Sequence, residues 1–142
     1  MEKPGQPAPA RLTFRRRQRL THAHEYQRAF KEGLKKVRGP LVVFAAENGL
    51  DHARIGLSVS GRVGNAVERN RIKRLLREAF RLGQREMPPG LDLVVTVRPH
   101  RALPLAAYSD LLRGASASLE REWQRRWRRV AAPGDGTEGE GP

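Results

Sequence analysis

Cysteine is absent from the 142-residue chain. Its absence excludes a disulfide-stabilised fold, a cysteine-based zinc site and a cysteine nucleophile. Long apolar stretches are missing as well: the longest unbroken apolar run, Leu41–Ala46, is far too short to cross a membrane. The N-terminal segment also lacks the apolar stretch of a signal peptide. These absences predict a cytoplasmic protein without membrane attachment.

The residue patterns of common catalytic sites are missing too. The four histidines are scattered along the chain, and no Ser/His/Asp arrangement is legible. Glu68 and Glu78 are separated so that they would point about 80° apart around a helix. No carboxylate pair therefore suggests a two-metal nuclease site. The sequence predicts no catalytic residue and no metal-binding residue in the protein itself.

Acidic residues are scarce relative to basic ones. The chain has 28 Lys and Arg against 15 Asp and Glu, a formal net charge of +13. The surplus is concentrated in residues 11–39, in residues 54–85 and in a run of arginines over residues 121–129. A surplus of this size on a small protein attracts phosphate at long range, so we expect a polyanionic partner.

Composition divides the chain into three parts. The apolar share of 38% is enough for one modest core. Residues 1–14 contain Pro4, Pro7 and Pro9 and are expected to form a flexible leader. Residues 131–142 are acidic and poor in apolar side chains, which predicts a disordered tail. Residues 15–130 are then the single folded domain, which we expect to bind the polyanionic partner.

Apolar spacing predicts helices and strands in the order α-β-β-α-β-α. A first helix is expected over residues 22–32, with Thr21 as its N-cap and Gly33 as its end. Strands are expected at residues 41–46, 54–60 and 91–97, and a last helix from residue 105 to the region of residue 127. The Asn48-Gly49 link between the first two strands suggests an antiparallel hairpin. The pattern predicts a compact α+β sandwich of one sheet and helices.

The most informative stretch is the second helix, expected over residues 65–82. Asn65 followed by Glu68 is a capping-box pattern. One face of this helix is apolar, and the other is a closely spaced row of basic residues that includes Asn70. Such a row presents several phosphate-binding side chains at once. The alternative is a solvated charged face, but nine bases against two acids over residues 54–85 repel one another and favour a bound polyanion.

Two further features allow more than one interpretation. The loop Gly61–Gly64 joins a strand to a helix N-terminus, where it could present backbone N–H groups to a phosphate or form a tight turn. Tyr26, Phe30 and Phe44 could stack on unpaired bases or pack in the core. The run of arginines at residues 15–17 supplies positive charge beside them, which favours stacking.

The stretch Arg69–Phe80, preceded by residues 56–60 and 64–67, resembles the signature of the bacterial ribonuclease P protein subunit. The resemblance extends over about residues 15–125. It implies a fourth strand near residues 35–38, the order α-β-β-β-α-β-α in a two-layer α/β sandwich, and a left-handed βαβ crossover. This chain has Gly61 and Arg62 where the family usually has two basic residues.

The resemblance also implies a function. The family's protein partners a catalytic RNA that uses Mg²⁺ to remove the 5′ leader of precursor tRNA, so the chain would be an accessory subunit with no obligate protein partner. The residues implied for binding the RNA subunit are Arg62, Arg69, Arg71, Lys73, Arg74 and Arg77. Those implied for the leader-binding cleft are Arg15, Arg17, Tyr26, Phe30, Phe44 and Asn70. A ribosomal or general RNA-binding protein is the main alternative, and a protein-only nuclease is a further one.

Overall fold

The computed structural model describes residues 13–130. The order of elements is α1 (Ala23–Glu32), β1 (Leu34–Arg38), β2 (Leu41–Glu47), β3 (Arg54–Ser58), α2 (Ala66–Leu82), β4 (Leu91–Val97) and α3 (Leu105–Val130). Two short 3-10 helices are also present: η1 (Arg16–Gln18) precedes α1, and η2 (Gln84–Glu86) lies between α2 and β4. This order confirms the predicted α+β class and places the fourth strand at residues 34–38.

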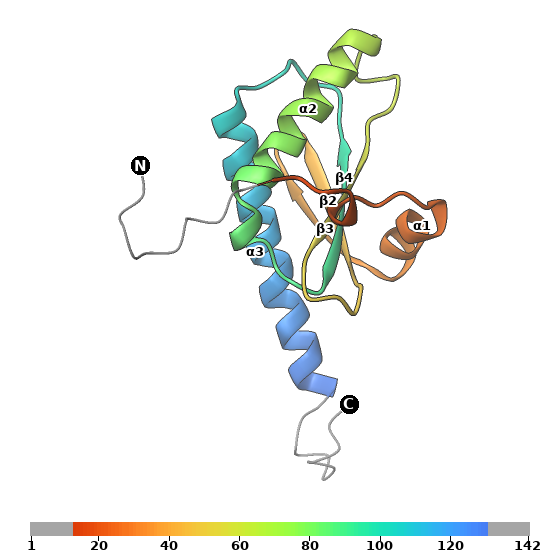
Figure 1. The fold of residues 1–142 in the computed structure, drawn as a ribbon, viewed down its shortest axis with the longest axis vertical. Helices are drawn as coiled ribbons and strands as arrows, with labels where there is room; N and C mark the ends of the chain where they lie inside the picture. Colours follow the sequence, from red (N-terminus) through yellow and green to blue (C-terminus); the bar gives the residue numbers. More distant parts are fainter. Residues whose placement is uncertain (1–12, 131–142) are drawn as a thin grey trace, which may run out of the picture.

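The four strands form one sheet in the order β1-β2-β4-β3. β1 pairs antiparallel with β2 through a tight turn at Gly39, whose φ of 54° suits glycine. β4 pairs antiparallel with β2 and parallel with β3. α2 makes the crossover between the parallel neighbours β3 and β4 (Figure 1). The left hand of that crossover stays a prediction.

The predicted hairpin between residues 41–46 and 54–60 is wrong. β4 lies between β2 and β3, and these two strands do not pair with each other. The reason is burial: β4 is apolar along almost its whole length and buried on both faces, so it occupies the centre of the sheet. The Asn48-Gly49 turn carries the chain across the end of β4 to the far edge.

Helices cover the two faces of the sheet unequally. α2 and α3 pack together on one face, and α1 lies on part of the other (Figure 1). The larger core is buried beneath α2 and α3, and the smaller one, which includes Ala29 and Val94, lies beneath α1. Within the described part of the chain, helices therefore leave part of the α1 face of the sheet uncovered.

The ends of the helices follow their capping residues. Asn65 caps α2, since its side chain accepts a hydrogen bond from the Glu68 N–H and the Glu68 carboxylate accepts one from the Asn65 N–H. The prediction of Thr21 as the α1 N-cap is wrong by one residue. His22 occupies that position, and the Glu25 carboxylate accepts from the backbone N–H groups of both Thr21 and His22.

The boundaries of the domain are only partly described. Phe14, at the end of the predicted leader, packs edge-to-face on Phe80 with 5.6 Å between ring centroids. Residues 1–12 of that leader and the predicted tail at 131–142 lie outside the described residues. Within residues 13–130, no helix is both long and apolar enough to span a bilayer.

Candidate nucleic-acid interface

α2 separates an apolar face from a basic face. Ile72, Leu76, Ala79 and Phe80 are buried against the sheet and α3. The basic face carries Lys73, Arg74 and Arg77, and the exposed Arg62 precedes the helix in the loop. Of the other two helical residues predicted to bind the RNA subunit, Arg69 donates to the Gly64 carbonyl oxygen at 3.4 Å and Arg71 borders a separate cavity beside His100. Within residues 13–130, the side chains of Arg71, Lys73 and Arg74 have no protein acceptor, so their donors are available to an external anion.

Arg77 is a partly buried cation of this face. Burial, together with the nearby positive charge of Arg19, holds the pKa of Arg77 below its usual value. Arg77, Arg19 and Lys73 line a small hollow of about 70 Å³ that Tyr26 also borders. Positive charges placed together without a carboxylate favour binding of a phosphate group.

The aromatic residues predicted to bind a single strand lie together on the α1 side of the sheet. Phe30 meets Phe44 of β2 edge-to-face, with 4.9 Å between ring centroids. Although it contacts Phe44, Phe30 is 42% exposed, which is high for a phenylalanine. A shallow groove of about 420 Å³ runs beside it and is lined by Ala23, Tyr26, Gln27, Phe30, Lys31 and Ser58.

Gly56 explains how Tyr26 reaches this groove. A Cβ atom at Gly56 would lie 2.7 Å from the Tyr26 ring, so the ring rests directly on the backbone of β3. The same tyrosine borders both the groove and the hollow beneath Arg77. The two residue sets predicted for RNA-subunit and leader binding therefore meet at Tyr26.

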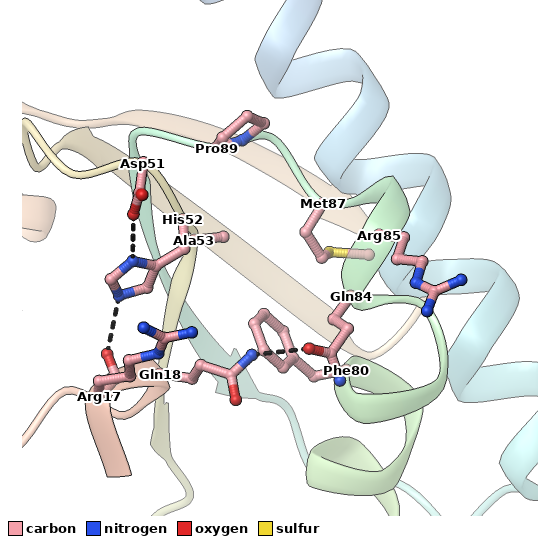
Figure 2. Close-up of a pocket in the computed structure, with 10 residues that line it drawn as sticks. All are labelled: Arg17, Gln18, Asp51, His52, Ala53, Phe80, Gln84, Arg85, Met87 and Pro89. Atoms are coloured by element: carbon pink, nitrogen blue, oxygen red, sulfur yellow. Dashed lines mark hydrogen bonds and ion pairs between the residues drawn. The ribbon is translucent and has the colours of Figure 1, made fainter. Parts of the chain in front are cut away.

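Not every predicted residue is at this meeting point. Arg15 is exposed and bonds through its Nε to Thr13. Arg17 lines a different cavity, of about 280 Å³, where its carbonyl oxygen lies 3.1 Å from His52 Nε2 (Figure 2). Asn70 is exposed on α2 and lines neither the groove nor the hollow. Leader binding by Arg15, Arg17 and Asn70 stays a prediction.

Sequence reasoning missed several groove residues. Lys31 and Ser58 line the groove, and the Lys35 ammonium lies 6.0 Å from the centroid of the Phe44 ring. Lys35 reaches that ring because β1 pairs Lys35 with Phe44, a register that no local pattern reveals. Ser58 and Lys31 come from elements that meet only when α1 folds onto the sheet.

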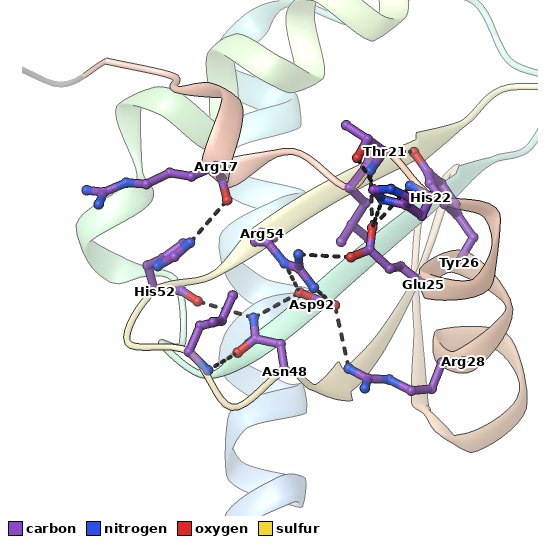
Figure 3. A network of polar contacts seen from close by, with 12 residues as sticks. Arg17, Thr21, His22, Glu25, Tyr26, Arg28, Asn48, His52, Arg54 and Asp92 are labelled. Carbon is purple, nitrogen blue, oxygen red and sulfur yellow. Dashed lines mark hydrogen bonds and ion pairs between the residues drawn. The ribbon is translucent and has the colours of Figure 1, made fainter.

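An ionic network holds α1 against the sheet. Arg54 of β3 makes two hydrogen bonds of 2.8 Å to Asp92, whose side chain is 1% exposed. Its third contact, at 3.0 Å, is to Glu25 of α1. Asn48 donates to Asp92 at 2.8 Å, and Arg28 of α1 donates to the Glu47 carbonyl oxygen. Figure 3 shows Arg54 between the carboxylates of Asp92 and Glu25.

The electrostatics of this network favour its charged form. Burial of Glu25 opposes ionisation, but hydrogen bonds from the His22 and Thr21 N–H groups and the charge of Arg54 outweigh it, so the pKa of Glu25 is lowered. Hydrogen bonding to Asp92 is the main cause of the raised pKa of Arg54. Because Tyr26 and Phe30 are on the same helix as Glu25, the network also positions the groove.

The described residues offer little for a metal ion. Among residues 13–130, no group of three or more His, Asp or Glu side chains is arranged to hold one.

Comparison with known proteins identifies the family. The family model described as Ribonuclease P matches residues 14–129. The chain belongs to the ribonuclease P protein family. A ribonuclease P protein component from Syntrophus aciditrophicus is 32% identical over 114 residues, which cover 80% of this chain and 94% of the relative. A second such component, from Pseudomonas entomophila, is 45% identical over 87 residues, which cover 60% of this chain and 65% of the relative.

Solved ribonuclease P proteins share the fold. The Thermotoga maritima protein has a TM-score of 0.64 and 30% identity, covering 72% of this chain and 96% of its own. The structure of the Staphylococcus aureus protein has a TM-score of 0.62 and 32% identity, and the match covers 69% of this chain and 91% of that protein. Family membership makes this chain a protein component of an endoribonuclease complex in tRNA processing and implies an RNA partner.

Proposed function

We propose that this ribonuclease P protein binds two RNAs at once. The basic face of α2 binds the catalytic RNA subunit, and the groove beside Phe30 binds the single-stranded 5′ leader of precursor tRNA. The protein thereby assists the RNA in removing the leader, leaving the mature 5′ end of the tRNA.

The exposed Phe30 ring, packed edge-to-face on the half-buried Phe44, carries the proposal. An unpaired base stacks on an aromatic ring, and the cations beside it follow the phosphate backbone. Lys31 supplies such a cation at the groove, and Lys35 supplies another beside the Phe44 ring. Double-stranded RNA would not use these rings, because its bases are already stacked on one another.

The charge of the protein supports a joint role. Two polyanions repel each other, and a protein of net charge +13 placed between them reduces that repulsion. We propose that catalysis uses Mg²⁺ bound by the RNA subunit and assign no protein residue to the metal. The expected gains are tighter binding of precursor tRNA and activity at lower Mg²⁺. A cytoplasmic location remains part of the proposal.

Substitution of Phe30 by Ala tests the groove. We expect the assembled complex to bind precursor tRNA with a leader more weakly by about 1–3 kcal/mol, the usual contribution of one stacked base. Binding of mature tRNA, which has no leader, should not change. Leu82→Ala is the matched control: Leu82 is also 42% exposed but lies at the end of α2, outside the groove.

Two results would contradict this assignment. If Phe30→Ala weakened binding of both RNAs equally, the groove would not be a leader site. If affinity did not depend on the leader even in the unaltered protein, a ribosomal or general RNA-binding role would be the better account.

A further inference from the structure

A second basic surface lies where the C-terminal half of α3 packs beside β1. It consists of Arg38 on β1 and of Ser118, Arg121, Arg125 and Arg126 on α3; we call it the α3–β1 surface. The three α3 arginines are exposed. The last turns of α3 run past the end of the sheet, away from the N-terminal end of α2 (Figure 1).

Two guanidinium groups donate hydrogen bonds to the same uncharged oxygen atom here. The Ser118 hydroxyl oxygen accepts from Arg38 Nη2 at 2.7 Å and from Arg121 Nη2 at 3.2 Å. A hydroxyl satisfies donors but cancels no charge, so the two cations are held close together and repel each other. Each guanidinium keeps further N–H donors, in the planar arrangement that suits phosphate oxygens.

Among residues 13–130, no carboxylate forms an ion pair with Arg38 or Arg121. The Glu122 carboxylate lies 2.8 Å from the Lys36 ammonium, and hydrogen bonding to Lys36 is the main cause of the lowered pKa of Glu122. Arg125 and Arg126 also lie close enough to lower that pKa. Glu120 is about 200° around the helix from Ser118, so it points away from the surface.

The helix dipole does not account for the arrangement. Cations are favoured in the last turn of a helix, but that effect fades beyond one turn. Arg121 precedes the end of α3, at Val130, by more than two turns, and Arg38 belongs to a strand. Convergence of cations from two different elements is what a bound anion would stabilise.

We propose that the α3–β1 surface binds phosphate groups of the catalytic RNA subunit, at a contact separate from that of α2. The inference rests on the proposed function and extends it. The protein would then hold two segments of the RNA, one at each end of its long axis, while the groove remains free for the leader.

The double variant Arg38→Gln/Arg121→Gln tests the contact. We expect weaker assembly with the RNA subunit and a plot of log affinity against log salt that is flatter by about 1.4–1.8 units, the change for two phosphates. Arg85→Gln/Arg113→Gln removes the same charge outside the surface and should retain the original slope. The conservative variant Arg38→Lys/Arg121→Lys should keep most of the slope. All three double variants should unfold at urea concentrations similar to that of the unaltered protein.

A tethered probe locates the contact independently. The chain has no cysteine, so Ala117→Cys, at an exposed position one turn before Arg121 on α3, and Ala66→Cys on α2 each create a unique attachment site for iron-EDTA. We expect each probe to cut the bound RNA subunit, at different nucleotides. Absence of cuts from residue 117, or an unchanged slope in Arg38→Gln/Arg121→Gln while the unaltered protein binds, would overturn this inference. Failure of the unaltered protein to bind the RNA subunit would instead overturn the proposed function.

Discussion

Replacing Asp92 with Asn should strongly destabilise the fold. The change preserves shape but removes the negative charge and turns one acceptor into a donor facing Arg54. Asp92 now accepts two bonds of 2.8 Å from Arg54 and one of 2.8 Å from Asn48. Its side chain is 1% exposed, so water cannot replace the lost partner.

The size of the effect follows from burial. Removing one partner of a buried ion pair costs about 3–5 kcal/mol, because the other charge is left uncompensated. Arg54 is 19% exposed and keeps its contact with Glu25, so we expect the lower end, about 3 kcal/mol. The free energy of unfolding of a typical domain is about 5–15 kcal/mol, so this loss would be a large share of the stability of the protein.

Urea unfolding of Asp92→Asn measures the effect directly. The midpoint should fall while the slope of free energy against urea stays constant. Glu86→Gln is the matched control, since Glu86 also lies 2.8 Å from an arginine, Arg113, but the two side chains are 60% and 48% exposed. That control should lose no more than about 1 kcal/mol. If Asp92→Asn lost as little, the network would not hold the fold as we describe.

Three further predictions address the interface and the network. Gly56→Ala should displace the Tyr26 ring, destabilise the protein by about 1–3 kcal/mol and weaken binding of precursor tRNA only when a leader is present; unchanged leader affinity in a titration would contradict this. Arg74→Gln should flatten the salt dependence of assembly with the RNA subunit by about 0.7–0.9 units, whereas an unchanged slope would mean that Arg74 only faces solvent. Stability should decline as the pH falls below about 4.5, because Glu25 binds protons more readily when unfolded than when folded. Urea midpoints of Glu25→Gln should decline less steeply over the same range; an equal decline would show that Glu25 does not contribute.

Local patterns predicted the elements better than their pairing. Asn65 and Glu68 marked the start of α2 because capping depends on residues adjacent in sequence. The place of β4 between β2 and β3 depends on its burial on both faces, which is decided by the whole fold. The strand at residues 34–38 carries Lys35, Lys36 and Arg38 and has a weak apolar signal, so only the family resemblance indicated it.

The candidate site likewise has one part that the local sequence predicts and another part that depends on the whole fold. The basic face of α2 could be predicted because one helical repeat generates it. The anchoring of α1 could not, since Arg54 and Asp92 are 38 residues apart and meet only through parallel pairing of β3 with β4. The convergence of Arg38 and Arg121 on Ser118 likewise joins residues far apart in the chain.

The central claim is that the protein assists a catalytic RNA in removing the leader. Cleavage of 5′-labelled precursor tRNA at low Mg²⁺ tests it most directly, with the protein alone, a bacterial ribonuclease P RNA alone, and both together. The account predicts correct 5′ maturation only in the combined reaction, given an RNA that is active by itself at high Mg²⁺. Cleavage by the protein alone, or no stimulation of that active RNA, would contradict it.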